Sequence, residues 1–388
     1  MWRLAGMPGV LILTAAGFAG FAVLLPVAPL WAVQGGADEA GSGLVNGVLM
    51  LTTILTQGFV PRLVRRFGAA PVLGTGLALL GGPSLLHLLS GSLEWILTLS
   101  AVRGIGFGIL TVCGSAAVAR LVPPARHGAG IGAYGAAIAV PQVLLLPIGP
   151  WLVEEVGFWL IFALGTLPLI SIAVAPRFGR AWRSSDTDVM DVASAGDGAD
   201  RRKWLPDGLL RPMFLLLGVT LAGGALITFA PQMVSIPLAA TGGLALLTAT
   251  AAVTRWGIGG FADRHGTRPF LGPLVLLTSA GLALAAFAVS DPTSTRVVMF
   301  LSAMALTGIA YGGLQNLTLL LSLSAVRREE YDTASAVWNM GFDAGTGAGS
   351  ILIGSLAAGL SFSPALLVAA GISLATLPLA LMRGRRRP

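Results

Sequence analysis

Cysteine, histidine and lysine are nearly absent from this chain of 388 residues, and the shortages exclude several classes of function. The single cysteine, Cys113, rules out an internal disulfide and a cysteine-based metal site. Three histidines, none near another, argue against a membrane enzyme, which needs clustered His, Asp or Glu on one face. No Gly-x-x-x-x-Gly-Lys-Ser/Thr loop occurs, which argues against an ATP-driven pump. We therefore expect no enzyme activity, no cofactor and no metal.

Charge is also scarce, and it occurs in short clusters. Charged residues make up 11% of the chain, hydrophobic residues make up 55%, and the mean hydropathy is +0.84, whereas about a quarter of the residues in soluble domains are charged. The net charge of +7 lies in arginine clusters between apolar runs, without the aromatic interleaving of a nucleic-acid surface. The composition predicts an integral membrane protein that contacts the lipid bilayer and a small-molecule substrate, with no nucleic acid.

At about 20 apolar residues per crossing, the sequence predicts an all-α membrane protein with twelve transmembrane helices. Strands are excluded because a lone strand in lipid leaves its backbone polar groups unpaired. The spans are expected near 9–33, 42–60, 71–90, 94–119, 128–152, 157–175, 212–235, 238–258, 269–289, 297–323, 333–358 and 363–382.

Basic residues mark alternate loops, and the other loops carry only Arg296. By the positive-inside rule, both termini and the long loop at 176–210 are predicted to be cytoplasmic. This loop is rich in Asp, Ser, Ala and Gly, so we expect a linker between an N-terminal bundle at 1–175 and a C-terminal bundle at 211–388. Arginine outnumbers lysine 23 to 1, which suggests a GC-rich bacterial genome and a place in the cell (cytoplasmic) membrane.

Two charged hinges indicate that the chain is a duplication. PRLVRRFGAAP begins at Pro61 and GGFADRHGTRP begins at Gly259, and each lies between the second and third span of its half. Their glycines, Gly68 and Gly266, are 198 residues apart. A parallel repeat of a six-helix unit accounts for this spacing. The sequence therefore predicts two pseudo-symmetric six-helix bundles.

The later hinge resembles the loop signature of the major facilitator superfamily, Gly-x-x-x-Asp-Arg-x-Gly-x-Arg. RGIGFG from Arg103 is similar to the family's second motif, and WNMGFDAGTG from Trp338 resembles a pattern of its bacterial efflux branches. The resemblance implies the family's fold and transport by alternating access, as in the twelve-helix drug:proton antiporters. Two features depart from the pattern: the fifth-span antiporter motif is present only as LLLPIGPW from Leu144, and the first hinge has Pro61 and Arg65 in place of the signature Gly and Asp.

The change of charge between the hinges leads to a hypothesis about gating. In the family that the chain resembles, the first hinge packs against the start of the eleventh span and the second against the start of the fifth. The start of the eleventh span is acidic here and the start of the fifth span is basic. We therefore expect each hinge to pair with the helix start of opposite charge, so that the two latches have opposite polarity. The alternative is that the loop charges are solvated. The predicted gating residues are Arg62, Arg65, Arg66, Gly68, Gly259, Asp263, Arg264, Gly266, Arg268, Glu329, Glu330 and Asp332, with Arg120, Arg126 and His127 as partners of Asp263.

Two ionisable residues, Arg103 and Asp343, are expected near mid-membrane. Such groups are costly in lipid and usually face a cavity, so the sequence predicts Asp343 as a protonation site and Arg103 as the charge that tunes it. Gly341, Gly345 and Gly349 form a stripe for close helix contact, and Asp343 lies about 200° round the helix from Gly341. The alternatives are an Arg103 tied to backbone carbonyls and an Asp343 that holds the interface between the halves.

The cavity of the resembled family is lined by spans one, four, seven and ten. The substrate-cavity candidates are therefore Thr220, Thr228, Gln232, Tyr311, Gln315 and Asn316, followed by Asn46, Gln142, Trp338 and Asn339. Helix–helix hydrogen bonds can satisfy such side chains without a substrate. His87 is expected to be an anchor at the membrane interface.

These features together predict a secondary active transporter, a monomer driven by the proton gradient. We expect export of a small, moderately apolar organic compound, because the spans are rich in glycine and poor in polar residues. Three alternatives stay open: a uniporter, a proton symporter that takes up a small polar metabolite, and a non-transporting membrane sensor on the same fold.

Overall fold

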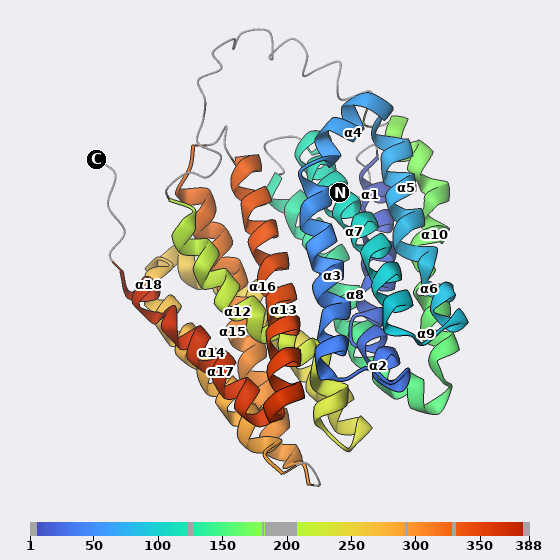
Figure 1. Cartoon of the computed structure of the whole chain (residues 1–388). Coiled ribbons are helices and arrows are strands. Elements are labelled where there is room, and N and C mark those ends of the chain that lie inside the picture. The colour runs from blue at the N-terminus through green and yellow to red at the C-terminus, as the bar shows by residue number, and fades with distance from the viewer. Residues whose placement is uncertain are drawn as a thin grey trace. The chain divides into compact units, whose positions relative to one another are not determined.

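The computed structural model describes residues 6–122, 127–180, 182, 208–291, 294–327 and 331–382. Within these ranges the chain forms helices and no strand (Figure 1), so the predicted all-α fold is confirmed. The chain divides into two compact units, which follow the two halves of the predicted duplication except that residues 26–50 of the first half belong to the second unit.

Unit 1 comprises Met1–Leu25 and Leu51–Trp204. In this unit α1 packs along α8, and α5 packs along α7. The helices of this unit are α1 (Met7–Leu24), α4 (Val60–Phe67), α5 (Ala69–Gly81), α6 (Pro83–Leu86), η1 (His87–Leu89), α7 (Leu93–Leu121), α8 (His127–Glu155), α9 (Phe158–Leu164), α10 (Leu167–Ser171) and η3 (Ile172–Val174).

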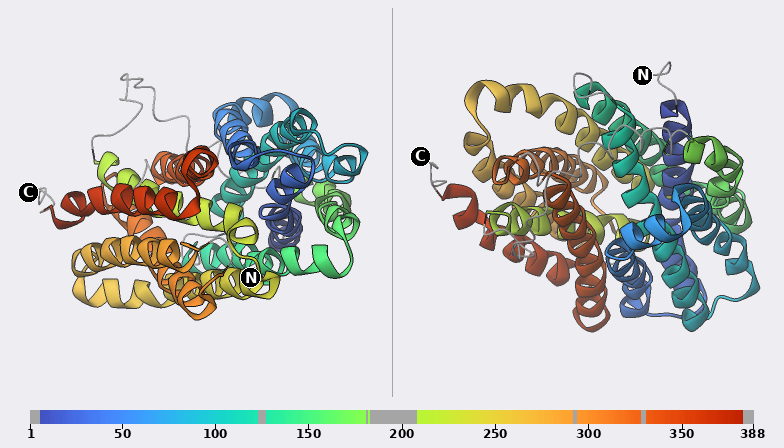
Figure 2. Two further views of the ribbon diagram at one scale, coloured as in Figure 1. Left: turned by 60° about the horizontal axis from the view of Figure 1, so that its bottom comes forward. Right: turned by 90° about the horizontal axis from the view of Figure 1, so that it is seen from above.

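Unit 2 comprises Pro26–Met50 and Leu205–Pro388, and α3 (Glu39–Gln57) begins in unit 2 and ends in unit 1. Within this unit α12 packs along α16, and α13 along α15 (Figure 2). Besides α3, the helices of this unit are α2 (Val27–Gln34), α12 (Leu210–Met233), α13 (Pro237–His265), α14 (Arg268–Ala288), α15 (Val297–Ser324), α16 (Tyr331–Leu360), α17 (Phe362–Ala375) and α18 (Leu377–Leu381). Residues 26–50 therefore group with the C-terminal helices, although they precede the linker.

Each predicted span coincides with one helix or with two or three consecutive helices. Among the described residues, ten helices are long and apolar enough to cross a membrane, and the bent pair α3 and α4 would make eleven. The one predicted span outside this set is the eleventh, α16, which is 30 residues long. It falls outside that set because its glycines, its polar residues and Asp343 lower its mean hydropathy.

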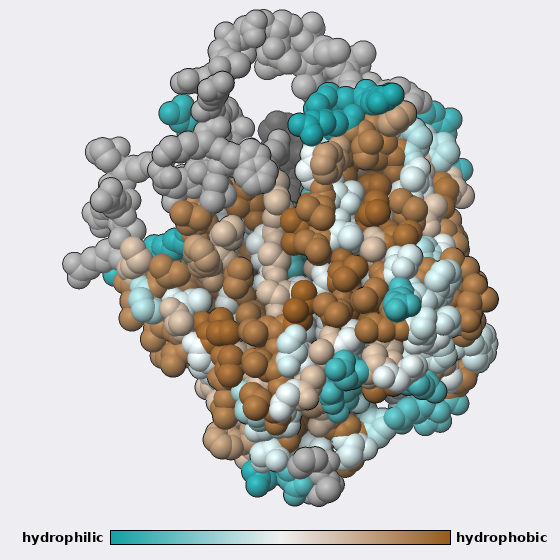
Figure 3. Space-filling model, in the orientation of Figure 1, coloured by the Kyte–Doolittle hydropathy of each residue, from teal (hydrophilic) through white to brown (hydrophobic). Residues whose placement is uncertain are grey.

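The outer faces of the helices are apolar. Trp256 is 89% exposed and Val298 is 80% exposed, which is the arrangement expected for side chains that contact lipid acyl chains. Figure 3 shows apolar residues over most of the visible helical surface, with hydrophilic residues gathered over α4. These hydrophilic residues include the arginines of the first hinge.

The backbone repeats the same conformation at both hinges. Gly68 has φ 86° and ψ 157°, and Gly266 has φ 76° and ψ 166°. Both lie in the left-handed region that favours glycine, and each follows the last residue of one helix within two residues of the start of the next. The predicted equivalence of the two hinge glycines is confirmed at the level of the backbone.

The hinges differ in the helix that leads into them. α13 runs unbroken for 29 residues to His265, whereas α3 and α4 meet at an angle of 55°. Pro61 lies in the first turn of α4, at the position that Gly259 occupies in the second hinge. Proline lacks the amide hydrogen that an unbroken helix would need there, so the departure from the signature glycine explains the bend.

Close contacts between helices also repeat in the two halves, and the later helices of each half are offset by 204 residues. A methyl group added to Gly108 would lie 2.7 Å from the carbonyl oxygen of Thr53, and one added to Gly312 would meet the carbonyl oxygen of Ala251. Gly108 and Gly312 are 204 residues apart, and their partners are 198 apart, as the hinge glycines are. The two bundles are therefore packed in the same register.

Candidate functional site

Asp343 lies inside unit 2 on α16, with 5% of its surface exposed. The glycine stripe of this helix packs against α12: added methyl groups at Gly341, Gly345 and Gly349 would meet Met213, Thr220 and Leu221 respectively. The predicted close contact is confirmed. Asp343 lies within electrostatic range of Tyr311 of α15.

A second charged side chain, Arg255 of α13, belongs to the same region. Its Nη1 donates a hydrogen bond to Oε1 of Gln315 over 3.1 Å, and its backbone oxygen accepts one from Nδ2 of Asn316 over 2.7 Å. Tyr311 lies within electrostatic range of both Arg255 and Asp343. The structure thus places a cation, an anion and three polar side chains on three helices of one bundle.

Aromatic rings border this group, which we call the charged cluster (Arg255, Tyr311, Gln315 and Asp343). The rings of Tyr311 and Phe342 have centroids 6.1 Å apart, and those of Phe342 and Trp338 are 5.8 Å apart. Nε1 of Trp338 donates a hydrogen bond to Oγ1 of Thr318 over 3.1 Å. Since Tyr311 packs against Gly223, where an added methyl group would meet its ring, the aromatic side is held in place by α12. This arrangement offers flat apolar surfaces beside charged groups.

Three other candidates form a separate neutral network, also within unit 2. Nδ2 of Asn46 donates to Oγ1 of Thr228 over 2.9 Å, and Thr228 is 2.8 Å from the hydroxyl of Ser350. Nε2 of Gln232 donates to Oγ of Ser42 over 2.8 Å. Gly43 packs against the carbonyl oxygen of Ser350, which brings α3 and α16 close together here. The network connects α3, α12 and α16 without any charge.

Three further candidates lie apart from both groups. The hydroxyl of Thr220 donates to the carbonyl oxygen of Leu216 in its own helix, over 2.9 Å, and contacts Gly345. Nδ2 of Asn339 likewise donates to Ser335 in its own helix. Gln142 lies half-buried on α8 in unit 1. The cavity prediction itself stays a prediction for all ten residues.

Arg103 is 1% exposed in unit 1 and is held by backbone oxygens. Its Nε donates to Leu80 over 3.4 Å, and its Nη2 donates to Gly20 over 3.2 Å, so it connects α7 with α5 and α1. This geometry is the packing alternative that the sequence left open. His87 is 0% exposed and stacks on Phe162 with centroids 4.9 Å apart. The prediction of an interfacial anchor at His87 is therefore wrong, because the ring lies in the protein interior.

The gating residues within the two hinges are exposed, apart from the partly buried Gly259. Nη2 of Arg268 donates to the carbonyl oxygen of Leu381 at the end of α18, and Arg120 lies 4.6 Å from the ring centre of Trp182. Three residues of the gating hypothesis, Arg126, Glu329 and Glu330, lie outside the described residues, as do the side chains of His127 and Asp332. The latches of opposite polarity stay a prediction.

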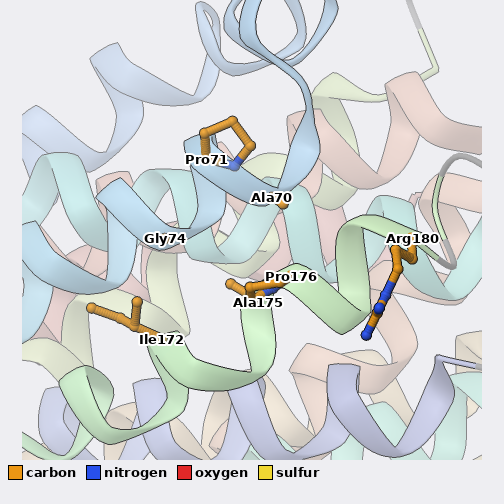
Figure 4. Close-up of a pocket in the computed structure, with 7 residues that line it drawn as sticks. All are labelled: Ala70, Pro71, Gly74, Ile172, Ala175, Pro176 and Arg180. Atoms are coloured by element: carbon orange, nitrogen blue, oxygen red, sulfur yellow. The ribbon is translucent and has the colours of Figure 1, made fainter.

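A depression of about 470 Å³ lies in unit 1 beside the first hinge. Figure 4 shows its lining, which is mainly apolar and includes the guanidinium of Arg180 and the ring of Pro71. None of the predicted site residues contributes to it. In the described part of the chain, no group of three or more His, Cys, Asp and Glu side chains is placed to hold a metal ion.

Arg255 is not among the predicted site residues, although it lies inside the predicted span 238–258. It is only three residues from the end of that span, so it reads as a flank of the charged hinge. In the structure α13 continues to His265, ten residues further, or about 15 Å at the rise of an α-helix. The signal that points to Arg255 is the 198-residue offset, which pairs it with Gln57, a polar residue three positions before the end of the second predicted span.

A duplicated six-helix unit with apolar outer faces and embedded charges defines a membrane transporter of two bundles. The sequence model of the Major Facilitator Superfamily matches residues 10–261 and 238–388. The chain belongs to this superfamily of transporters.

Solved structures support the fold. A crystal structure of the nucleoside transporter NupG matches with a TM-score of 0.72 at 13% identity, covering 97% of this chain and 100% of the other. A mutant of NupG matches with a TM-score of 0.68 at 14% identity, covering 97% and 98%. At such identities the likeness concerns the fold alone. Among curated proteins, none matches the chain significantly.

Proposed function

We propose that this chain is a proton-coupled secondary transporter in which Asp343 binds and releases the proton. The observation that carries the proposal is the burial of Asp343 on α16, within electrostatic reach of Tyr311. A charged carboxylate inside a transmembrane helix bundle lowers stability, so a purely structural role does not explain its presence. A reversible proton site needs such a group where the surroundings respond to its charge.

The charge that tunes Asp343 is better assigned to Arg255 than to Arg103. Arg103 belongs to the other unit and is engaged by two backbone carbonyls. Arg255 shares a bundle with Asp343, and both interact with Tyr311. We therefore assign the tuning charge to Arg255.

The first candidate for the cargo is a small, moderately apolar organic compound, exported in exchange for protons. It follows from the apolar, glycine-rich spans and from the aromatic side of the charged cluster. The second candidate is uptake of a small polar metabolite together with protons. It is favoured by the amide, phenol and guanidinium groups that the structure gathers around Gln315.

Flux in proteoliposomes with an imposed pH gradient tests this function. A panel of neutral, anionic and cationic organic compounds is offered, and proton movement is followed with a pH-sensitive dye inside the vesicles. A coupled transporter moves protons when its cargo is added, and the sign of that movement separates exchange from cotransport. Flux without proton movement would identify a uniporter, and binding of a panel compound without flux would identify a sensor.

A further inference from the structure

The guanidinium of Arg255 has few hydrogen-bond acceptors for a charged group inside a helix bundle. It carries five N–H donors, and among the residues that the structure describes one of them, on Nη1, has an acceptor, the neutral amide oxygen of Gln315. Arg211 in the same bundle shows the contrast, because its Nε and Nη2 donate to the carbonyl oxygens of Leu379 and Ala380. Arg103 is likewise held by two carbonyls. Arg255 is therefore oriented by a side chain and retains donors for another acceptor.

The fold does not need a charge at this position. Gln57 occupies the equivalent place in the first bundle, 198 residues earlier, and Thr111 is equivalent to Gln315, 204 residues earlier. Nε2 of Gln57 lies 3.5 Å from Oγ1 of Thr111, so a neutral pair connects the same two helices. Since the neutral pair serves the packing in one bundle, the packing of the other does not explain why it contains an arginine.

The surroundings of Arg255 suit an organic group beside the charge. Tyr311 interacts with the guanidinium and stands next to Phe342, which in turn stands next to Trp338. Aromatic rings offer large apolar contact areas, and the phenol and amide groups offer directed hydrogen bonds. A guanidinium prefers carboxylate, sulfonate and phosphate groups, because its planar fork matches two oxygens at once.

We propose that Arg255 binds an anionic group of the cargo, so that the transported compound is a small organic anion. Gln315 orients the guanidinium, and the aromatic side of the charged cluster contacts the organic part. This inference rests on the proposed transport function and selects its second candidate. An anion near Tyr311 is opposed by ionised Asp343 and tolerated by protonated Asp343, so anion and proton bind together and cotransport results.

Binding to the detergent-purified, full-length protein tests the inference without a gradient. The probes are benzenesulfonate, phenylphosphonate and benzoate, each compared with a neutral counterpart (benzenesulfonamide or benzamide) and with benzyltrimethylammonium. Binding is measured as the concentration-dependent rise in melting temperature. We expect at least one anion to raise it, with its neutral counterpart about tenfold weaker or worse. If none of the anions stabilises the protein, or if the cation does so instead, the inference is overturned.

Variants locate the binding group. Arg255→Gln reproduces the chemistry of Gln57 and should lower the anion affinity about tenfold or more, while Arg255→Lys should retain part of it. Arg211→Gln is the matched control, because it removes an arginine of the same bundle that is engaged by carbonyls, and the anion-dependent shift should persist. An unchanged shift in Arg255→Gln would contradict the inference. Proton-coupled flux that survives alongside this result would leave the proposed function standing.

Discussion

The two bundles use one pair of equivalent positions for different chemistry. In the first, Gln57 meets Thr111, and in the second, Arg255 meets Gln315. The backbone around both pairs is the same: Gly108 and Gly312 let the same two helices touch, and Gly68 and Gly266 turn the chain in the same conformation. The comparison shows that the duplicated scaffold forms the same helix contacts with a neutral pair in one half and with an arginine in the other.

The same contrast extends to the eleventh span and its equivalent. Trp338 donates to Thr318 in the second bundle, and 204 residues earlier Tyr134 stands against Gly114 in the first. Each bundle thus places an aromatic ring at this helix crossing. The acid of the second bundle has no such counterpart, because Ala139 occupies the place of Asp343. Packing residues are duplicated in kind, and the two charges occur in the second half alone.

The largest effect is expected where the shared packing is broken. Gly312→Ala and Gly108→Ala should each destabilise the protein by up to about 3 kcal/mol, because the added methyl group meets a backbone oxygen that cannot move away cheaply. Thermal unfolding of the purified variants measures this. Gly257→Ala is the control, since nothing lies within 4 Å of the added methyl group. Tolerance at one of the two glycines alone would break the equivalence of the bundles.

The neutral network of the second bundle can be tested separately from the charged cluster. Thr228→Val removes a hydroxyl that bonds to Asn46 and Ser350, and leaves both buried partners without it. We expect a loss of about 2 kcal/mol in the free energy of unfolding. Denaturation measures the loss, and anion binding by the same variant should be unchanged. A weaker anion affinity in Thr228→Val would mean that the two groups are one site.

Flux should separate the two equivalent pairs. Arg255→Gln is expected to lower transport of the cargo about tenfold, which corresponds to about 1.4 kcal/mol. Thr111→Val changes the neutral pair of the first bundle and should alter transport about twofold or less. Initial rates in proteoliposomes measure both at matched protein content. Equal losses in the two variants would show that these positions serve packing in both halves.

The smallest effect concerns a turn that occurs in both halves. Gly157 has φ 100° and ψ 170°, and Ser361, its equivalent, has φ 110° and ψ 170°. This conformation strains a residue with a side chain, and Ser361 is the only non-glycine residue with positive φ among those the structure describes. Ser361→Gly should stabilise the protein by up to about 1 kcal/mol, and Gly157→Ser should destabilise it by a similar amount. Melting temperatures of the two variants check the opposite signs.

The sequence was informative wherever a pattern is local. The apolar runs predicted the helices, the repeated hinge predicted two glycines with the same backbone conformation, and the four-residue spacing of Gly341, Gly345 and Gly349 predicted a close helix contact. These features depend on the chain's own geometry, so a single sequence contains them.

Features that depend on a neighbouring helix were not predictable in the same way. The carbonyl partners of Arg103 belong to two other helices, and no side chain in the sequence marks them. The hydroxyls of Ser42 and Ser350 join the neutral network only because α3, α12 and α16 come together. Arg255 could have been found by aligning the second half on the first, since the offset of the hinges places it opposite Gln57.

Coupled flux in the Asp343→Asn variant tests whether the second bundle contains the proton site of the transporter. Proteoliposomes containing this variant are compared with the wild type in two assays, accumulation of cargo driven by a pH gradient and exchange of cargo across the membrane without a gradient. We expect that accumulation is lost while exchange persists, because the neutral amide mimics the protonated acid permanently. Accumulation at the wild-type rate with the same pH dependence would contradict it and would make Asp343 a structural residue.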